Sequence, residues 1–280
     1  MRRRLFLCAF LFSFLPLAFG EENKISQTFS ETIEDNSILV EEAYNQDAGV
    51  VQHIFNVLYS LRRPRDLELN FTQEWPVVSH RHQLSYTIPA LFQDGGPDGL
   101  GDIMLNYRYQ LFDEDDAAAV APRLSLIFPT GNNDKGTGFG TTGVQINFPV
   151  SKRWTNHFIT HFNIGGTFLP GVHQTLTTGA VAKKTLLFAN VGVSLGWLAT
   201  EHFNFLLEYT TNFLSGIDGT GALHRFNQYS LNPFFRGSVD VGTLQIVPGI
   251  GFPLIWNDGA FQPGVFFYLS FEHPFMKTKE

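Results

Sequence analysis

Apolar and polar side chains alternate along the chain from about residue 50 to its C-terminal end. In the segment 103–111 the odd positions are Ile, Leu, Tyr, Tyr and Leu, whereas the even positions are Met, Asn, Arg and Gln. The segment 191–197 alternates Val, Val, Leu and Trp with Gly, Ser and Gly. Successive side chains of a β-strand point to opposite faces, so this pattern places one face in an apolar medium and the other in a polar one.

Runs of this kind predict about twelve strands, an even number of the sort found in bacterial outer-membrane barrels. A soluble sandwich or lipocalin-like barrel would also alternate, but its outer face would be charged rather than rich in Phe, Leu and Trp. We therefore predict an all-β fold, a transmembrane up-and-down antiparallel β-barrel. The expected strands are 50–60, 67–75, 82–89, 101–112, 119–128, 141–149, 153–169, 183–198, 202–213, 225–237, 241–255 and 262–275.

Connections between these strands alternate in length, as short periplasmic turns and long external loops do in transmembrane barrels. The expected short connections are 113–117, 149–152, 199–201 and 238–240. The expected long ones are 90–100, 129–140, 170–182 and 214–224. Both chain termini are then expected on the periplasmic side.

Composition supports a membrane barrel and excludes other classes. Of the 280 residues 15% are aromatic and 16% charged, whereas soluble domains carry roughly 25% charged residues. A net charge of −7 argues against an electrostatic nucleic-acid binder. Outer-membrane lipid and a small-molecule substrate are the expected partners, with no nucleic acid and no cofactor.

The N-terminus has the features of a cleaved signal peptide, which favours export over an N-terminal membrane anchor. Three arginines at 2–4 precede an apolar run, and Ala18-Phe-Gly20 forms a small-x-small cleavage site. The only cysteine, Cys8, leaves with this peptide, so neither disulfides nor a cysteine metal site are expected. The predicted organisation is a signal peptide at 1–20, a periplasmic N-terminal lead-in at 21–49, an outer-membrane β-barrel at 50–275 and a C-terminal tail at 276–280. The barrel pattern leaves the role of 41–52 unexplained.

Two segments carry a family resemblance. Gly99-Leu-Gly-Asp102 opens a Tyr-rich alternating strand, and the next strand, starting at Pro122, ends in Pro129-Thr-Gly131. The chain thereby resembles the family of outer-membrane transporters named for the MetA pathway of phenol degradation. That resemblance implies a small outer-membrane barrel that passes hydrophobic or aromatic compounds.

The last strand resembles the C-terminal recognition signal of outer-membrane proteins. It presents an apolar face of Val265, Phe267, Leu269 and Phe271 and ends at Phe275. This resemblance implies that the barrel-assembly machinery is a partner. The match is imperfect, because the residues 276–280 follow the aromatic residue that usually ends the chain.

Function is expected on the inward-facing side chains. Charges there are costly unless they are paired or hydrated, so acidic and basic groups should face each other across the lumen. One reading is an ionic network that plugs the barrel, and the other is a selectivity or substrate site. The candidate lumen-lining residues are Glu68, Glu74, Arg108, Arg123, His157, His161, Glu208, Arg236 and Glu272.

Catalysis and metal binding are weakly indicated, and we expect neither. His157 and His161 share a strand face but lie roughly 13 Å apart in extended chain, too far to hold one metal ion by themselves. His224, Ser230 and Glu208 could form a lipid-hydrolase set, but no nucleophile motif accompanies them. The function classes that remain are a passive transporter or channel, a structural barrel with a plugged lumen, and, with least support, a barrel lipid hydrolase.

Overall fold

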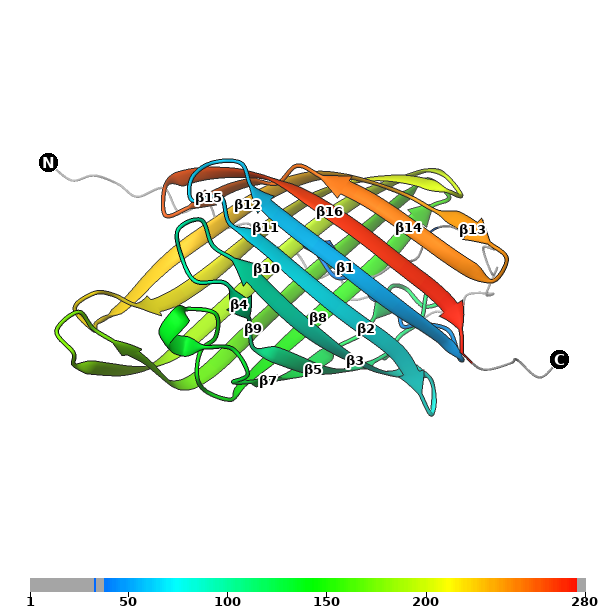
Figure 1. The fold of residues 1–280 in the computed structure, drawn as a ribbon. Coiled ribbons are helices and arrows are strands. Elements are labelled where there is room, and N and C mark those ends of the chain that lie inside the picture. Colours follow the sequence, from blue (N-terminus) through cyan, green and yellow to red (C-terminus); the bar gives the residue numbers. More distant parts are fainter. Residues whose placement is uncertain (1–32, 34–37, 276–280) are drawn as a thin grey trace, which may run out of the picture.

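The computed structural model describes residue 33 and residues 38–275, which form a closed antiparallel β-barrel (Figure 1). The barrel closes where β1 (Val50–Ser60) pairs along its whole length with β16 (Ala260–Pro274). This architecture confirms the predicted fold class. The predicted signal peptide and the tail 276–280 lie outside the described residues.

Twelve strands make up the barrel wall, and four of them are interrupted. The other uninterrupted strands are β2 (Leu67–Val77), β3 (Ser79–Phe92), β8 (Gly143–Thr155), β9 (Phe158–Thr175), β10 (Val181–Thr200) and β11 (Phe203–Ile217). The interrupted ones are β4–β5 (Gly99–Leu100, Ile103–Tyr109), β6–β7 (Ala119–Val120, Arg123–Phe128), β12–β13 (Leu223–Gly237, Val239–Val241) and β14–β15 (Leu244–Gly251, Leu254–Asn257). A short 3-10 helix, η1 (Asn133–Lys135), follows β7. None of the helices in the described ranges is long and apolar enough to cross a membrane.

Large apolar side chains cover the outside of the barrel. In β10 the odd residues from Val191 to Trp197 are 36% to 56% exposed, whereas the even residues between them are buried. The same alternation exposes Leu105 and Tyr107 on β5 and Phe267 on β16. Water-soluble monomers rarely expose so much contiguous apolar surface, and transmembrane barrels carry it as their lipid-facing band.

The two ends of the barrel differ. At one end, here called the turn end, the connections 78, 156–157, 201–202 and 242–243 are tight and 110–118 is longer. The barrel also begins and ends there, since the Phe275 amide donates to the Gly49 carbonyl at 2.8 Å. At the opposite end, here called the loop end, the connections include 93–98, 129–142, 176–180 and 218–222.

Several predicted connections are strand in the structure. The segment 149–152 lies within β8, because its residues continue the alternation and the turn comes only at 156–157. Most of 170–182 and 214–224 is also strand, since β9 to β12 extend past their neighbours at the loop end (Figure 1). Gly171, a turn signal in the sequence, instead adopts φ 69° beside a bulge in the pairing of β9 with β10.

The hairpin between β11 and β12 turns through Asp218. Its carboxylate accepts hydrogen bonds from the Thr220 hydroxyl at 2.6 Å and from the amides of Ala222 and Thr220 at 3.0 and 2.8 Å. These bonds lower the pKa of Asp218 below its usual value, and the bond from the Thr220 hydroxyl contributes most. The turn is thus closed by an ionised side chain outside the barrel.

Candidate functional site: the filled lumen

Residues 38–48, which precede β1 and are called the lumen segment here, lie inside the barrel. The amides of Leu39 and Val40 donate to Glu208 Oε1 on β11 at 3.2 and 3.1 Å. On the other side of the segment, the Ala43 amide donates to Ser151 Oγ on β8 at 2.8 Å. The part of the predicted lead-in that the structure describes is therefore an internal plug.

Amide side chains of the barrel wall bind the main chain of the lumen segment. The Glu41 amide donates to Asn163 Oδ1, and Asn163 Nδ2 donates back to the Glu41 carbonyl, both at 2.7 Å. Gln110 makes a similar pair of bonds with Asn45 N and Ala43 O, at 2.9 and 2.7 Å. Buried main-chain groups need hydrogen-bond partners, and here side chains supply the partners that a neighbouring strand would otherwise provide.

Arginines of the wall pair with acidic residues of the lumen segment. Glu41 lies against Arg108 Nη2 at 3.2 Å and against Arg123, whose Nε is 3.0 Å from Oε2 and whose Nη2 makes a second ion pair. Arg236 Nη1 lies 2.8 Å from Glu42 Oε1. These side chains are all largely buried. Removing one partner of a buried ion pair leaves an uncompensated charge, so the network holds the segment in place.

The structure brings most of the sequence-predicted residues together on the luminal face, where the arginines make ion pairs with residues outside the barrel strands. Their partners are Glu41 and Glu42, which sequence reasoning did not select. The sequence did contain one signal for these two residues. They are adjacent acids in a segment that lacks strand periodicity, in a chain whose strands carry inward-facing arginines. The predicted residues that are buried are Glu74, Arg108, His161, Glu208 and Arg236, and those that are partly buried are Arg123 and Glu272. Two are exposed: Glu68 near the loop end of β2, and His157 in the β8–β9 turn.

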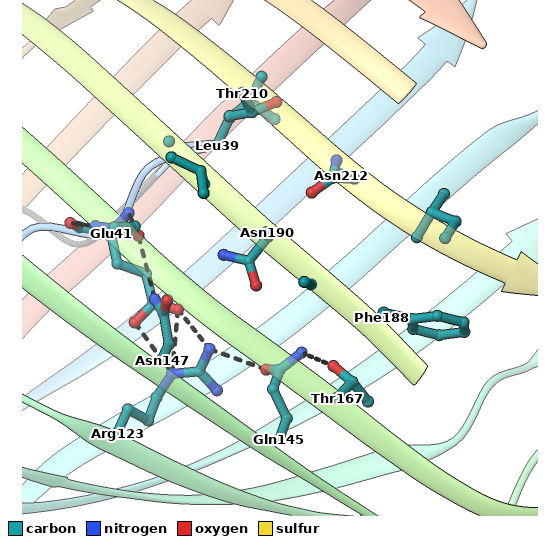
Figure 2. A pocket seen from close by; sticks show the side chains of 15 residues that line it. Leu39, Glu41, Arg123, Gln145, Asn147, Thr167, Phe188, Asn190, Thr210 and Asn212 are labelled. Carbon is teal, nitrogen blue, oxygen red and sulfur yellow. Dashed lines mark hydrogen bonds and ion pairs between the residues drawn. The ribbon is translucent and has the colours of Figure 1, made fainter. Parts of the chain in front are cut away.

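Two cavities flank the lumen segment and meet at the ion pair of Glu41 with Arg123, which lines both. The first lobe, of about 290 Å³, lies against β8 to β11 (Figure 2). The second lobe, of about 240 Å³, lies against β1 to β3, β5 and β7. Amide and hydroxyl side chains line both lobes alongside apolar groups, and include Gln145, Asn147, Asn190, Thr210 and Asn212 in the first lobe and Asn56, Asn70, Thr72, Thr87 and Asn106 in the second.

An apolar cluster narrows the lumen nearer the loop end. Ile127, Leu169, Val172 and Leu186 are buried there, and partly buried apolar side chains pack against them. One of these is Phe139 from the loop 129–142, whose ring lies 5.8 Å from that of Phe188, centroid to centroid. The loop therefore folds inward over the lumen rather than away from it.

Asp102 fastens this loop. Its Oδ1 accepts from the Gly131 amide at 2.9 Å and its Oδ2 from the Phe139 amide at 2.7 Å. The Thr130 hydroxyl accepts from Ile103 N and donates to the Gly101 carbonyl, at 2.8 and 3.0 Å. The Gly-Asp and Pro-Thr-Gly segments that carry the family resemblance thus bind each other, in a contact called the clasp below.

The hydrolase set suggested by the sequence is not assembled. His224 and Ser230 lie six residues apart on β12, roughly 20 Å in extended chain, and Glu208 instead accepts from Asn232 Nδ2 at 2.7 Å. A different set does line up, because Ser151 Oγ lies 2.7 Å from His161 Nδ1 and His161 Nε2 lies 3.9 Å from Glu42 Oε1.

This second set fastens the lumen segment. All three side chains are buried, Ser151 Oγ accepts from the Ala43 amide, and neither lobe is lined by any of the three. Within the described residues, no group of three or more His, Cys, Asp or Glu is arranged to hold a metal ion.

Comparison with known proteins identifies the fold. No family model matches this chain, and neither does any curated protein. Among solved structures, an outer membrane channel from Pseudomonas putida F1 matches with a TM-score of 0.62 at 10% identity, over 85% of this chain and 99% of that one. The NanC porin matches with a TM-score of 0.49 at 10% identity, over 78% and 98% of the two chains. At 10% identity, the likeness to the Pseudomonas putida channel establishes a shared barrel architecture.

Proposed function

We propose that this protein is a passive channel of the bacterial outer membrane whose pathway runs through the two lobes and is closed by the lumen segment. The apolar outer surface supports a membrane location. The polar lining of both lobes supports a hydrated interior. The Pseudomonas putida structure with the same architecture is described as an outer membrane channel, which agrees with this assignment.

The observation that carries the proposal is the position of Glu41. Its carboxylate bonds to Arg123 at the boundary shared by both lobes, and its backbone belongs to a segment outside the barrel strands. The lumen segment is held mainly by side chains, so it can leave without breaking a strand-to-strand hydrogen bond. Its departure would join the two lobes into one passage.

Single-channel recording of the refolded protein in a planar bilayer tests the channel. Deletion of 38–48 should convert a low or intermittent conductance into a sustained one. Glu41→Gln should lengthen the open intervals, because it removes the carboxylate charge that Arg108 and Arg123 both contact. Glu201→Gln, in the exposed β10–β11 turn, removes the same charge far from the segment and should change nothing.

A structural barrel with a permanently filled lumen is the second candidate. The observation that favours it is the number of buried polar bonds between segment and wall. In that case the deletion variant would fold and yet conduct no ions. A conducting deletion variant would exclude this alternative.

Export and assembly complete the proposal. A signal peptide cleaved after Gly20 would deliver the chain to the periplasm, and the apolar face of β16 would engage the barrel-assembly machinery. Phe275 lies at the end of β16 with an exposed side chain. Phe275→Ser should therefore lower the yield of inserted barrel in cells while leaving refolding in detergent intact.

The lining of the two lobes bears on which class of compound the channel would transport. Resemblance to the MetA-pathway transporters implied hydrophobic or aromatic compounds. The lobes present amides and hydroxyls alongside apolar side chains, and a buried polar group without a partner is costly. This lining favours a polar solute.

A further inference from the structure

One cross-strand row of the first lobe brings two amide oxygens together over a glycine. Asn147 on β8 pairs in register with Gly165 on β9, which pairs with Asn190 on β10. A Cβ at Gly165 would lie 2.8 Å from Asn147 Oδ1 and 2.7 Å from Asn190 Oδ1. Both oxygens therefore converge above Gly165, in a notch that any larger residue would fill.

One of these oxygens is buried without a hydrogen bond. Asn147 is 6% exposed, and its Oδ1 has no partner among the described residues, whereas its Nδ2 donates to Asn163 at 3.1 Å. Asn56 lines the second lobe, and its Oδ1 is likewise buried without a hydrogen-bond partner among the described residues. An unsatisfied buried acceptor costs free energy. A solute that fits here must therefore donate hydrogen bonds.

The charges around the lobes are balanced. Among the residues lining the first lobe, Glu41 and Arg123 are the charged ones, and they bond to each other. The second lobe adds Arg108 and Glu74, again one charge of each sign. Neither lobe thus offers the excess of one sign that would favour an ion.

We propose that the notch above Gly165 is a binding subsite for a small uncharged solute rich in hydroxyl groups, of the size of a monosaccharide. A volume of about 290 Å³ lies at the small end of ligand pockets, roughly 300–1,000 Å³. Phe188 lines the same lobe (Figure 2) and adds an apolar group to it. This inference rests on the proposed function, since it names the class of solute that the channel takes.

Saturation-transfer NMR on the full mature protein in detergent micelles tests the subsite with three sugar-derived probes of similar size and one smaller aromatic probe. Glucose is the uncharged polyol, gluconate and glucosamine carry one negative and one positive charge, and phenol is the aromatic probe. Glucose should bind, and the other three should bind at least about tenfold more weakly. Tighter binding of any of the three would overturn the proposal, as would the absence of glucose binding.

Two substitutions locate the binding. Gly165→Ala places a methyl group against both side-chain oxygens and against the Ile146 carbonyl oxygen, 2.7 Å from its Cβ, and should weaken glucose binding at least about tenfold. Gly166→Ala is the matched control, because the nearest atom its Cβ would meet is the Phe188 carbonyl oxygen at 3.3 Å. Asn190→Leu keeps the branched shape and the number of side-chain heavy atoms but removes the acceptor, and the lost hydrogen bond should weaken binding about three- to tenfold. Unchanged affinity in both Gly165→Ala and Asn190→Leu would overturn the assignment.

The two proposals fail in distinguishable ways. Conductance by the 38–48 deletion variant without glucose binding to the intact protein would overturn the subsite alone. Glucose binding that depends on Gly165, in a protein whose deletion variant conducts no ions, would overturn the channel and retain the subsite.

Discussion

The lumen is narrowed twice, and the two closures rest on different physics. Toward the turn end, the lumen segment is held by ion pairs and by side chains that bond to its main chain. Toward the loop end, the loop 129–142 is held by an apolar cluster and one buried carboxylate, Asp102. The first closure depends on matching charges and the second on apolar area.

This difference determines how each closure can open. A charged closure loses most of its stability when one partner is removed, because the remaining charge stays buried. An apolar closure loses stability in proportion to the surface it exposes and is insensitive to ionic strength. A barrel with both closures can respond to different conditions at its two ends.

The largest expected effect comes from Arg123→Met at the charged closure. Glu41 would keep Arg108 as its one cationic partner, and breaking a buried pair costs about 3–5 kcal/mol. Hydrogen exchange of the amides at 39–46 should accelerate roughly a hundredfold or more, as measured by mass spectrometry.

The double variant Arg123→Met, Glu41→Gln serves as the control for this prediction. With the Glu41 charge also removed, exchange should slow relative to the single variant but stay faster than in the unmodified protein, because Arg108 then loses its contact with the Glu41 carboxylate. If the single and double variants exchange equally fast, the ion pair does not hold the segment.

Leu169→Ala tests the apolar closure and should cost about 2–4 kcal/mol, since Leu169 is fully buried in the loop-end cluster. Exchange should accelerate at 131–139 and stay unchanged at 39–46. The effect should be the same in low and high salt. A response of the lumen segment to this substitution would show that the two closures are coupled.

Asp102→Asn is expected to have a smaller effect at the same closure, about 1–2 kcal/mol. Each carboxylate oxygen accepts one amide of the loop, and an amide side chain retains one acceptor of the two. Exchange at Gly131 and Phe139 should rise. Asp98→Asn is the matched control, because Asp98 accepts the Gln93 amide in an exposed loop, and it should leave the clasp unchanged.

The barrel wall was predictable because its information is local. Alternation within each strand fixes which side chains face outward, and it places Arg108 and Arg123 on the same side as Asn106. Strand ends were harder to predict. Pro149 and Gly171 fall in predicted connections, but Pro149 lies in the regular pairing of β8 with β9 and Gly171 beside a bulge between β9 and β10.

The closures were not predictable in the same way, since their contacts join distant positions. Glu41 meets Arg123 across 82 residues, and Gln46 meets Glu272 across 226. No periodicity marks 38–48, so the sequence shows two adjacent acids without showing where they bind. The Gly-Asp and Pro-Thr-Gly segments were visible as motifs, but that they bind each other required the fold.

The last prediction assigns each closure to a side of the membrane and should leave stability unchanged, within about 0.5 kcal/mol for exposed sites. Long loops face outward and short turns face the periplasm in outer-membrane barrels, so the loop end should be external. An epitope inserted at Gly219, exposed in the β11–β12 hairpin, should bind antibody on intact cells. The same epitope at Asp115, exposed at the turn end, should be reached only after the outer membrane is permeabilised. Labelling of Asp115 on intact cells would invert the orientation, and the charged closure rather than the apolar one would then meet the environment first.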